Sequence, residues 1–313
     1  MATSSSKKTG YLLSLLSIFI FSFNTNFMFS LMPTWIEPNG LIVIRCVTSF
    51  VFFFVVTRFI AKGKRGNPSV KEKLMMMLGG VLGLGGNLLF YINGLSMVTP
   101  IEATIIRTSQ PVMIAILSFF FLRDPMTIWK VLGIIVSAIG AVFISIHPNA
   151  PGDSSSFLGD LLILGSTITY AFYLVLIKPV VEKQNPFVVM MWMSLASVII
   201  TAPFGWKDVI TSELFTSSAK LFPWFEVAYI AGFATTIGYW LNLKALDYVT
   251  PFEEGVLYYL MPVMVGIVAI LMGLQHFSWR DPIALGIIIL GFLIMNIRKD
   301  TKWLKGLFLV NHH

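Results

Sequence analysis

Apolar residues fill ten segments of the chain, each long enough or nearly long enough to cross a hydrocarbon layer of about 30 Å. The breaks between them carry Pro, Gly or Asn beside charged residues. The segments are 11–32, 40–61, 74–94, 100–122, 129–146, 157–177, 186–204, 224–243, 251–274 and 282–297. This pattern predicts an all-α membrane protein with ten transmembrane helices.

One stretch of the chain returns 151 positions later. Between Leu95 and Ile116, nine of 22 positions are identical at that spacing, including two prolines and a glutamate. Apolar composition alone would not align such residues, so one helical unit has been used twice. We expect a first five-helix repeat over 1–150, a second over 151–300 and a short cytoplasmic tail over 301–313.

Positive charges give the expected orientation. With the N-terminus inside, 17 of the 22 lysines and arginines fall in cytoplasmic segments, three fall outside and two, Arg45 and Arg107, lie within spans. This bias predicts that both termini are cytoplasmic. Five helices, an odd number, precede the second copy, so the two repeats are expected to be inverted relative to each other.

Each repeat contains a helix with a proline near its middle. Thr99 and Thr250 each precede a proline and stand three residues before a glutamate, a pattern that predicts a helix start closed by a capping box. Pro111 and Pro262 follow about 16 Å along these helices. An interior proline frees the carbonyl four residues earlier, so we expect both helices to open there and to gate transport.

Composition excludes several classes of protein. Only 12% of the residues are charged and the mean hydropathy is +0.82, which is typical of an integral membrane protein of the cell membrane. The net charge of +7 is explained by topology rather than by nucleic-acid binding. The single cysteine, Cys46, and four scattered histidines predict neither a disulfide nor a metal site. We expect no cofactor, and no nucleotide-binding motif or catalytic constellation indicates an enzyme.

These features resemble the drug/metabolite transporter superfamily, in its ten-helix form built from two EamA domains. The resemblance rests on the inverted five-plus-five topology, on the Leu-x-x-Val-Thr-Pro approach to each proline-broken helix, on the Pro-Val-Met centre of each, and on Arg45. It implies an exporter of amino acids or other small metabolites, with a cavity lined by helices 1, 3, 4, 6, 8 and 9.

Arg107 is the strongest candidate for substrate recognition. It lies about 10 Å below its helix start, too deep to face lipid. It could form a buried ion pair, cap the carbonyls opened by Pro111, or clamp a substrate carboxylate or phosphate. Its repeat equivalent is Tyr258, which also precedes its central proline by four residues.

Three glutamates lie in the first turns of the proline-broken helices. Glu102 and Glu253 occupy capping-box positions, so we interpret them as structural. Glu254 is not needed for the cap and shares a helix face with Tyr258. It could be partly solvated at the helix end, or it could bind a substrate cation or take up a proton.

Four further residues complete the predicted substrate site. They lie in the first, third, sixth and eighth helices and are Asn24, Tyr91, Tyr173 and Trp240. Packing or interhelical hydrogen bonds could equally explain them. For Arg45 we expect anchoring, with its side chain reaching the outer surface.

The sequence therefore predicts a secondary transporter for a small polar or zwitterionic metabolite such as an amino acid, and the family resemblance implies export. Proton coupling through Glu254 is a possibility, and the lipid bilayer is the other expected partner. The alternative is a proton-coupled multidrug efflux transporter, although the first helix has Asn24 and Asn26 where such exporters need a carboxylate.

Overall fold

The computed structural model describes residues 4–32, 34–59, 68–98, 103, 106–107, 109–124, 126–145, 156–215, 221–273 and 279–295. The described residues form helices and short connections and contain no strand. Six of their helices are long and apolar enough to cross a membrane on length and composition alone.

The first repeat supplies five spans. Their helices are α1 (Ser4–Leu31), α2 (Pro38–Phe59), α3 (Val70–Gly80), the π-helix η1 (Val81–Gly85), α4 (Gly86–Leu95), α6 (Gln110–Leu122) and α7 (Ile128–Ser145). The helices α3, η1 and α4 follow one another without a break and make one span. Residues 106–107 are helical ahead of α6.

The second repeat supplies the other five. Its helices are α8 (Phe157–Val181), α9 (Pro186–Ile210), the 3₁₀ turn η2 (Glu213–Phe215), α10 (Leu221–Ala228), the π-helix η3 (Tyr229–Gly238), α11 (Tyr239–Ala245), α12 (Pro251–Leu257), the 3₁₀ turn η4 (Tyr258–Leu260), α13 (Met261–Leu271) and α14 (Arg280–Met295). Because α10 to α11 and α12 to α13 are each continuous, the prediction of ten spanning helices is confirmed. The span expected to end at 204 was too short, since α9 continues to Ile210.

The second helices of the two repeats, α2 and α9, pack side by side in opposite directions. A Cβ on Gly205, near the end of α9, would lie 2.1 Å from the carbonyl oxygen of Asn39, at the start of α2. At the other end, Thr57 donates to the carbonyl of Phe187 at 3.3 Å. Equivalent helices that run antiparallel show that the repeats are inverted, as the odd helix number predicts.

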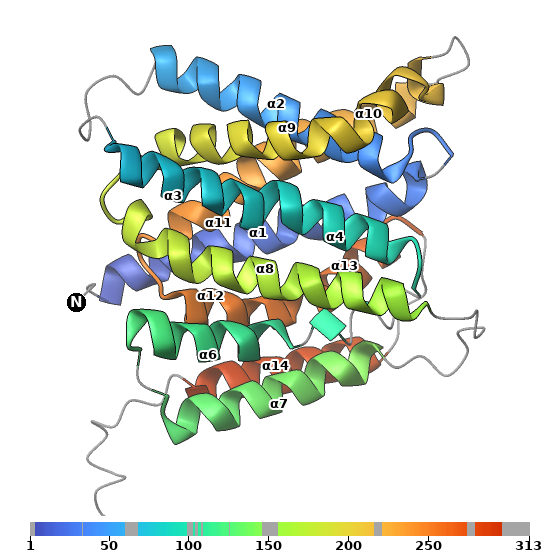
Figure 1. Ribbon diagram of the computed structural model, residues 1–313. Coiled ribbons are helices and arrows are strands. Elements are labelled where there is room, and N and C mark those ends of the chain that lie inside the picture. Colours follow the sequence, from blue (N-terminus) through green and yellow to red (C-terminus); the bar gives the residue numbers. More distant parts are fainter. Residues whose placement is uncertain are drawn as a thin grey trace, which may run out of the picture.

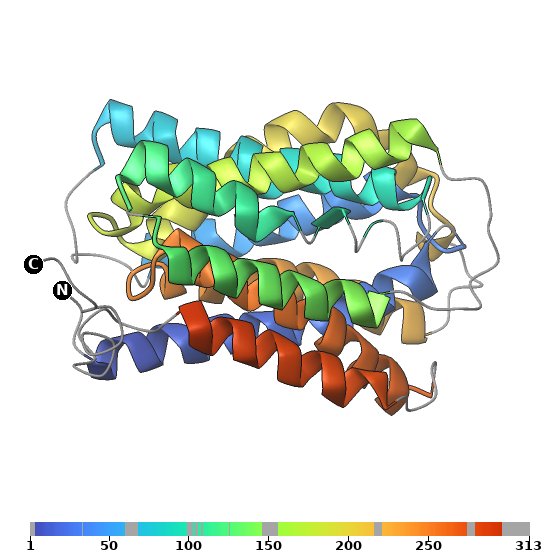
Figure 2. The same cartoon turned by 90° about the horizontal axis from the view of Figure 1, so that it is seen from below.

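The fifth helices, α7 and α14, form a second antiparallel pair. Gly133 approaches Gly291 closely, while Gly140 approaches Ala284. Between these contacts, Ser137 Oγ donates to the carbonyl of Ile288 at 3.3 Å. In Figure 1 this pair lies at one edge of the bundle and α2 with α9 at the other; Figure 2 gives the view at right angles. Most of the remaining helices lie between the two pairs.

The central helices also contact one another in matching pairs. In one half α1 packs against η3, α11 and α13, and in the other α8 packs against α4 and α6. The first helix of each repeat therefore lies against the third and fourth helices of the opposite repeat. Residues at the centre are contributed by both repeats.

The proline-broken helices are interrupted as expected. In the second copy α12 ends at Leu257, a 3₁₀ turn follows, and α13 begins with Pro262 in its first turn. In the first copy α6 begins with Pro111 in its first turn. The expectation of a free carbonyl at Tyr258 is wrong, because the Met261 N–H donates to it in the 3₁₀ turn.

Two π-helical stretches were not expected from the sequence. They are η1 and η3, which occupy the same place in the third helix of each repeat. In η3, Thr235 Oγ1 donates to the carbonyl of Ile230 at 2.7 Å and Thr236 Oγ1 to that of Ala231 at 2.9 Å. Such wide turns change which side chains face the centre and recur at functional sites.

Apolar side chains cover much of the outside of the bundle, and many polar ones lie within it. Phe120, Ile139 and Leu290 are exposed, whereas Ser49, Ser137 and Ser194 are fully buried. This distribution suits a lipid environment. Lys7, Lys130, Glu253 and Met295 line one cleft, which places the N-terminal end of α1 and the end of α14 on one side, here named the N-terminal face. That this face is cytoplasmic stays a prediction, and the tail beyond 295 lies outside the described residues.

Candidate functional site

The start of α12 is fixed by its capping box. The Glu253 N–H donates to Thr250 Oγ1 at 3.2 Å, and the Thr250 N–H donates to Glu253 Oε2 at 2.9 Å. The other Glu253 oxygen accepts from Lys7 at 2.5 Å and from the Tyr11 hydroxyl at 3.0 Å. The structural interpretation of Glu253 is confirmed, and the same cap ties α1 to α12. The matching Glu102 lies outside the described residues.

Glu254, the next residue, points into the bundle instead. It is 0% exposed, so partial solvation at the helix end is wrong. Its carboxyl accepts hydrogen bonds from Ser14 Oγ of α1 and from Asn242 Nδ2 of α11. Among the described residues it forms no ion pair, and a buried carboxylate without a cation is costly.

A chain of hydrogen bonds leads from Glu254 toward the middle of the bundle. Asn242 Oδ1 accepts from the Tyr170 hydroxyl at 3.2 Å, and the Tyr170 and Tyr258 hydroxyl oxygens lie 2.8 Å apart. The proton of Tyr170 is used toward Asn242, so Tyr258 donates to Tyr170. Two predicted site residues, Glu254 and Tyr258, are thus joined through side chains of α8 and α11.

Ser14 can serve Glu254 in either protonation state. Its hydroxyl lies 3.1 Å from the carbonyl oxygen of Gly10 as well as within reach of Glu254. With the carboxylate charged, Ser14 can donate to it. With the carboxyl protonated, Glu254 can donate to Ser14 Oγ, which then donates to Gly10. Sequence reasoning missed Ser14; small residues at Gly10, Ser14 and Ser17 on one helix face were the available signal.

Arg107 lies over the ring of Tyr91, with its Cζ 4.2 Å from the ring centroid. This is a cation–π contact across adjacent helices of the first repeat. Arg107 is partly exposed and close enough to interact electrostatically with Tyr239 and Tyr258. In the described part of the chain no carboxylate lies within ion-pair distance of it. A buried ion pair is therefore not seen there, and its guanidinium edge retains hydrogen-bond donors.

Arg45 corrects the prediction of an outer anchor. It is 1% exposed, and its Nε donates to Thr235 Oγ1 at 2.8 Å while one terminal nitrogen donates to Met28 Sδ at 3.1 Å. The side chain turns inward because α2 packs against η3 and α9, which leaves it no path to the surface. Periodicity could not reveal this, since α2 is apolar on all sides.

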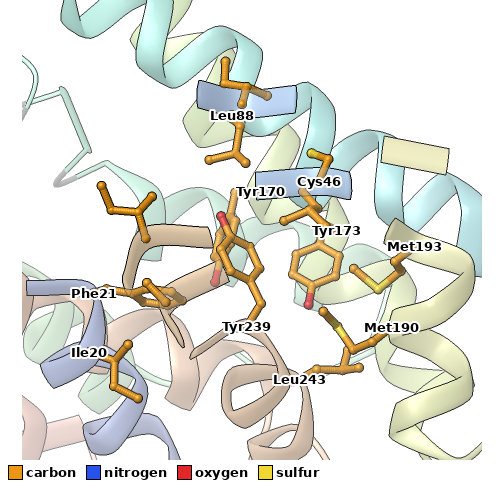
Figure 3. Packing of buried hydrophobic residues seen from close by; sticks show 14 of the residues in the cluster. Ile20, Phe21, Cys46, Leu88, Tyr170, Tyr173, Met190, Met193, Tyr239 and Leu243 are labelled. Carbon is orange, nitrogen blue, oxygen red and sulfur yellow. The ribbon is translucent and has the colours of Figure 1, made fainter. Parts of the chain in front are cut away.

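Tyr170 and Tyr173 form the core of an aromatic group at the centre, with ring centroids 5.4 Å apart. Figure 3 shows them beside Tyr239, with Phe21 on one side and Met190 and Met193 on the other. Tyr173 is fully buried, yet its hydroxyl has no hydrogen-bond partner among the residues that the structure describes.

Asn24 Oδ1 and Trp240 Nε1 are also buried and have no partner in the described part of the chain. Asn24 donates to Met28 Sδ at 3.9 Å, which places it beside Arg45. Trp240 instead stacks on Phe187, with centroids 5.2 Å apart, between α11 and α9. One central region therefore contains five of the predicted site residues, which are Arg107, Tyr91, Tyr258, Glu254 and Tyr173. Asn24 is linked to this region through Met28, whereas Trp240 faces away from it toward α9.

The described residues hold no group of three or more His, Cys, Asp or Glu side chains that could bind a metal ion. The chemistry that they offer is hydrogen bonding, cation–π contact and proton uptake. Such groups, on broken helices from two inverted repeats, are suited to reversible binding at the middle of a membrane.

Comparison with known proteins accounts for this architecture. Residues 8–146 and 157–297 each match the EamA-like transporter family. The chain belongs to that family. It is therefore a multi-pass membrane transporter, matched by the family once in each half. The division at residue 150 stays a prediction.

Relatives agree with this assignment. The chain is 26% identical over 229 residues to the uncharacterized transporter YyaM of Bacillus subtilis, covering 70% of this chain and 72% of the relative. It is 22% identical over 272 residues to the uncharacterized transporter YetK of the same organism, covering 85% and 79%. A solved crystal structure aligns with a TM-score of 0.74 at 19% identity, covering 92% of this chain and 96% of that one, which supports the fold.

Proposed function

We propose that the protein is a secondary transporter that exports a small zwitterionic metabolite, such as an amino acid, by alternating access. The observation that carries the proposal is that a positively charged side chain and an acidic side chain lie near the same central tyrosine. Tyr258 lies near both Arg107 and Glu254. A guanidinium and a carboxyl are therefore both near this tyrosine.

The Arg107 side suits a carboxylate. A guanidinium presents donors in a planar fork that fits both oxygens at once. Stacking on Tyr91 fixes the plane of the fork while leaving its edge available. The substrate carboxylate is assigned to this edge, and its ammonium group to the tyrosine hydroxyls toward Glu254.

The Glu254 side suits proton coupling. The carboxyl is fully buried, and its described partners are neutral. Ser14 can satisfy the charged form and the protonated form without any movement of the backbone. A proton could therefore be held during one half of the cycle and released when the N-terminal face opens.

The fold suits alternating access. Each broken helix contributes to the centre from one of the two inverted repeats, so rocking the repeats against each other opens one face and then the other. At the N-terminal face the pair Lys7–Glu253 joins α1 to α12, and these helices must separate when that face opens.

The test is uptake of labelled amino acids into proteoliposomes that contain the purified protein. We expect time-dependent, saturable uptake that unlabelled amino acid competes away. Arg107→Ala should lower uptake at least about tenfold, since a charge-assisted hydrogen bond is lost, whereas Arg58→Ala, at the exposed end of α2, should not. Transport of cationic drugs with no amino acid transport would overturn the proposal in favour of multidrug efflux.

A further inference from the structure

Two guanidinium groups converge on the same pair of tyrosines in the centre of the protein. Arg107 stacks on Tyr91, and Tyr239 lies within electrostatic range of it. Arg45 also lies near both of these tyrosines. The two arginines reach this region from different helices, α2 and the helix that precedes α6.

Within the described part of the chain, neither arginine has an acidic counterpart. The four ion pairs there all involve lysines, and neither Arg45 nor Arg107 takes part in one. The ionisable side chains near Arg45 are Tyr239, Cys46 and Tyr91. Glu254 lies near Tyr170, Tyr173 and Tyr258, and its hydrogen-bond partners are Ser14 and Asn242 rather than either arginine.

The hydrogen bonds of Arg45 leave much of its donor capacity unused. It has five N–H groups. The described contacts are two, to a threonine hydroxyl and to a thioether sulfur, and both acceptors are neutral. Burying a cation among neutral partners is unfavourable unless an anion joins it. A purely structural clip to Thr235 would not need a charge, because a neutral amide could donate there.

We propose that Arg45 binds a second anionic group of the substrate, so that the preferred substrates are amino acids with an acidic side chain. This inference rests on the proposed function. Arg107 takes one carboxylate and Arg45 the other, with Tyr91 and Tyr239 forming the walls between them. The substrate then carries two negative groups and one positive group, which complements two arginines and one ionisable carboxyl.

Glutamate and glutamine are the probes that test the inference, because they have nearly the same shape and differ in one charge. Binding to the purified wild-type protein is measured by thermal shift, and transport by competition in proteoliposomes. We expect glutamate to bind at least about tenfold more tightly than glutamine, the effect of one charge-assisted hydrogen bond. Equal binding of the two would overturn the inference while leaving amino acid transport intact. Binding of neither, and of no other amino acid, would overturn the proposed function itself.

Variants of Arg45 test whether this residue is responsible for the preference for glutamate over glutamine. Arg45→Gln should reduce the preference for glutamate over glutamine to about one, because an amide can still donate to Thr235 but carries no charge. Arg58→Gln, on the same helix and exposed, should keep the wild-type preference. If Arg45→Gln folds and retains the preference, Arg45 is not the second anion site. If it does not fold, the wild-type comparison of the two probes still decides the matter.

Discussion

At the scale of single residues, the account depends on Glu254 having suitable partners with and without a proton. Ser14 provides this by lying between the carboxyl and the carbonyl of Gly10. The neighbouring Glu253, although one residue away, is engaged by its cap and by Lys7. Two adjacent carboxyl groups therefore have different roles, because one faces the helix end and the other faces the bundle.

Changing Ser14 tests this arrangement. Ser14→Ala removes the hydroxyl and should lower proton-driven transport at least about tenfold, since a hydrogen bond to a charged group contributes roughly 1.5–3 kcal/mol. Ser14→Thr keeps the hydroxyl and should retain most activity. Uptake into proteoliposomes under an imposed pH gradient measures both. Equal activity of the alanine and threonine variants would exclude a role for the hydroxyl.

Arg107 offers a second test, one that separates charge from geometry. Arg107→Lys keeps the positive charge but loses the planar fork and the stacking on Tyr91, so we expect about tenfold weaker competition by amino acids. Binding competition against labelled substrate is the measurement. Full affinity in the lysine variant would mean that charge alone is recognised.

At the scale of elements, the starts and breaks of the central helices could be predicted, because they depend on residues close together in the sequence. The capping box at Thr250 and Glu253 and the break at Pro262 follow from residue types at fixed spacing, and the structure confirms both. The inward position of Arg45 and the π-helices η1 and η3 could not be predicted in the same way. They depend on which helices pack around α2 and on glycines that permit close contact, and both are tertiary facts.

The broken helix α12–α13 should matter for transport more than for folding. Pro262→Ala allows a regular helix to form across the 3₁₀ turn, which would stiffen the joint beside Tyr258. We expect flux to fall several-fold while expression and thermal stability are retained, and the same for Pro111→Ala. Pro186→Ala is the control, because this proline lies in the first turn of α9 and interrupts nothing. Unchanged flux in both central variants would remove the proline joints from the mechanism.

Close packing of α2 on α9 should instead be essential for stability. Ala at position 205 would bring its Cβ to 2.1 Å from a backbone oxygen of α2, so the helices must separate. Overpacking of this kind costs about 1–3 kcal/mol, so Gly205→Ala should lower the melting temperature. Gly286→Ala is the control, since no atom lies within 4 Å of a Cβ there. Thermal melting of the two purified variants should differ clearly; identical melting would contradict the tight helix pairing.

At the scale of the whole molecule, the inverted repeats place unlike chemistry at equivalent positions. In the first repeat Arg107 stacks on Tyr91. The residues 151 positions later are Tyr258 and Asn242, which are linked through the hydroxyl of Tyr170. The repeat in the sequence was sufficient to predict the topology. It could not predict the substrate site, because that site depends on residues that differ between the two copies. These are Arg107 in the first copy and Glu254 in the second.

The most direct test of the account compares two modes of transport in proteoliposomes carrying Glu254→Gln. The account predicts that exchange of labelled for unlabelled amino acid continues, because the substrate side at Arg107 is intact. Accumulation driven by a pH gradient should be abolished, because the amide cannot take up and release the proton. Glu182→Gln, a carboxylate more than half exposed at the end of α8, should behave like the wild type in both modes. Gradient-driven accumulation at the wild-type level in Glu254→Gln would contradict the account.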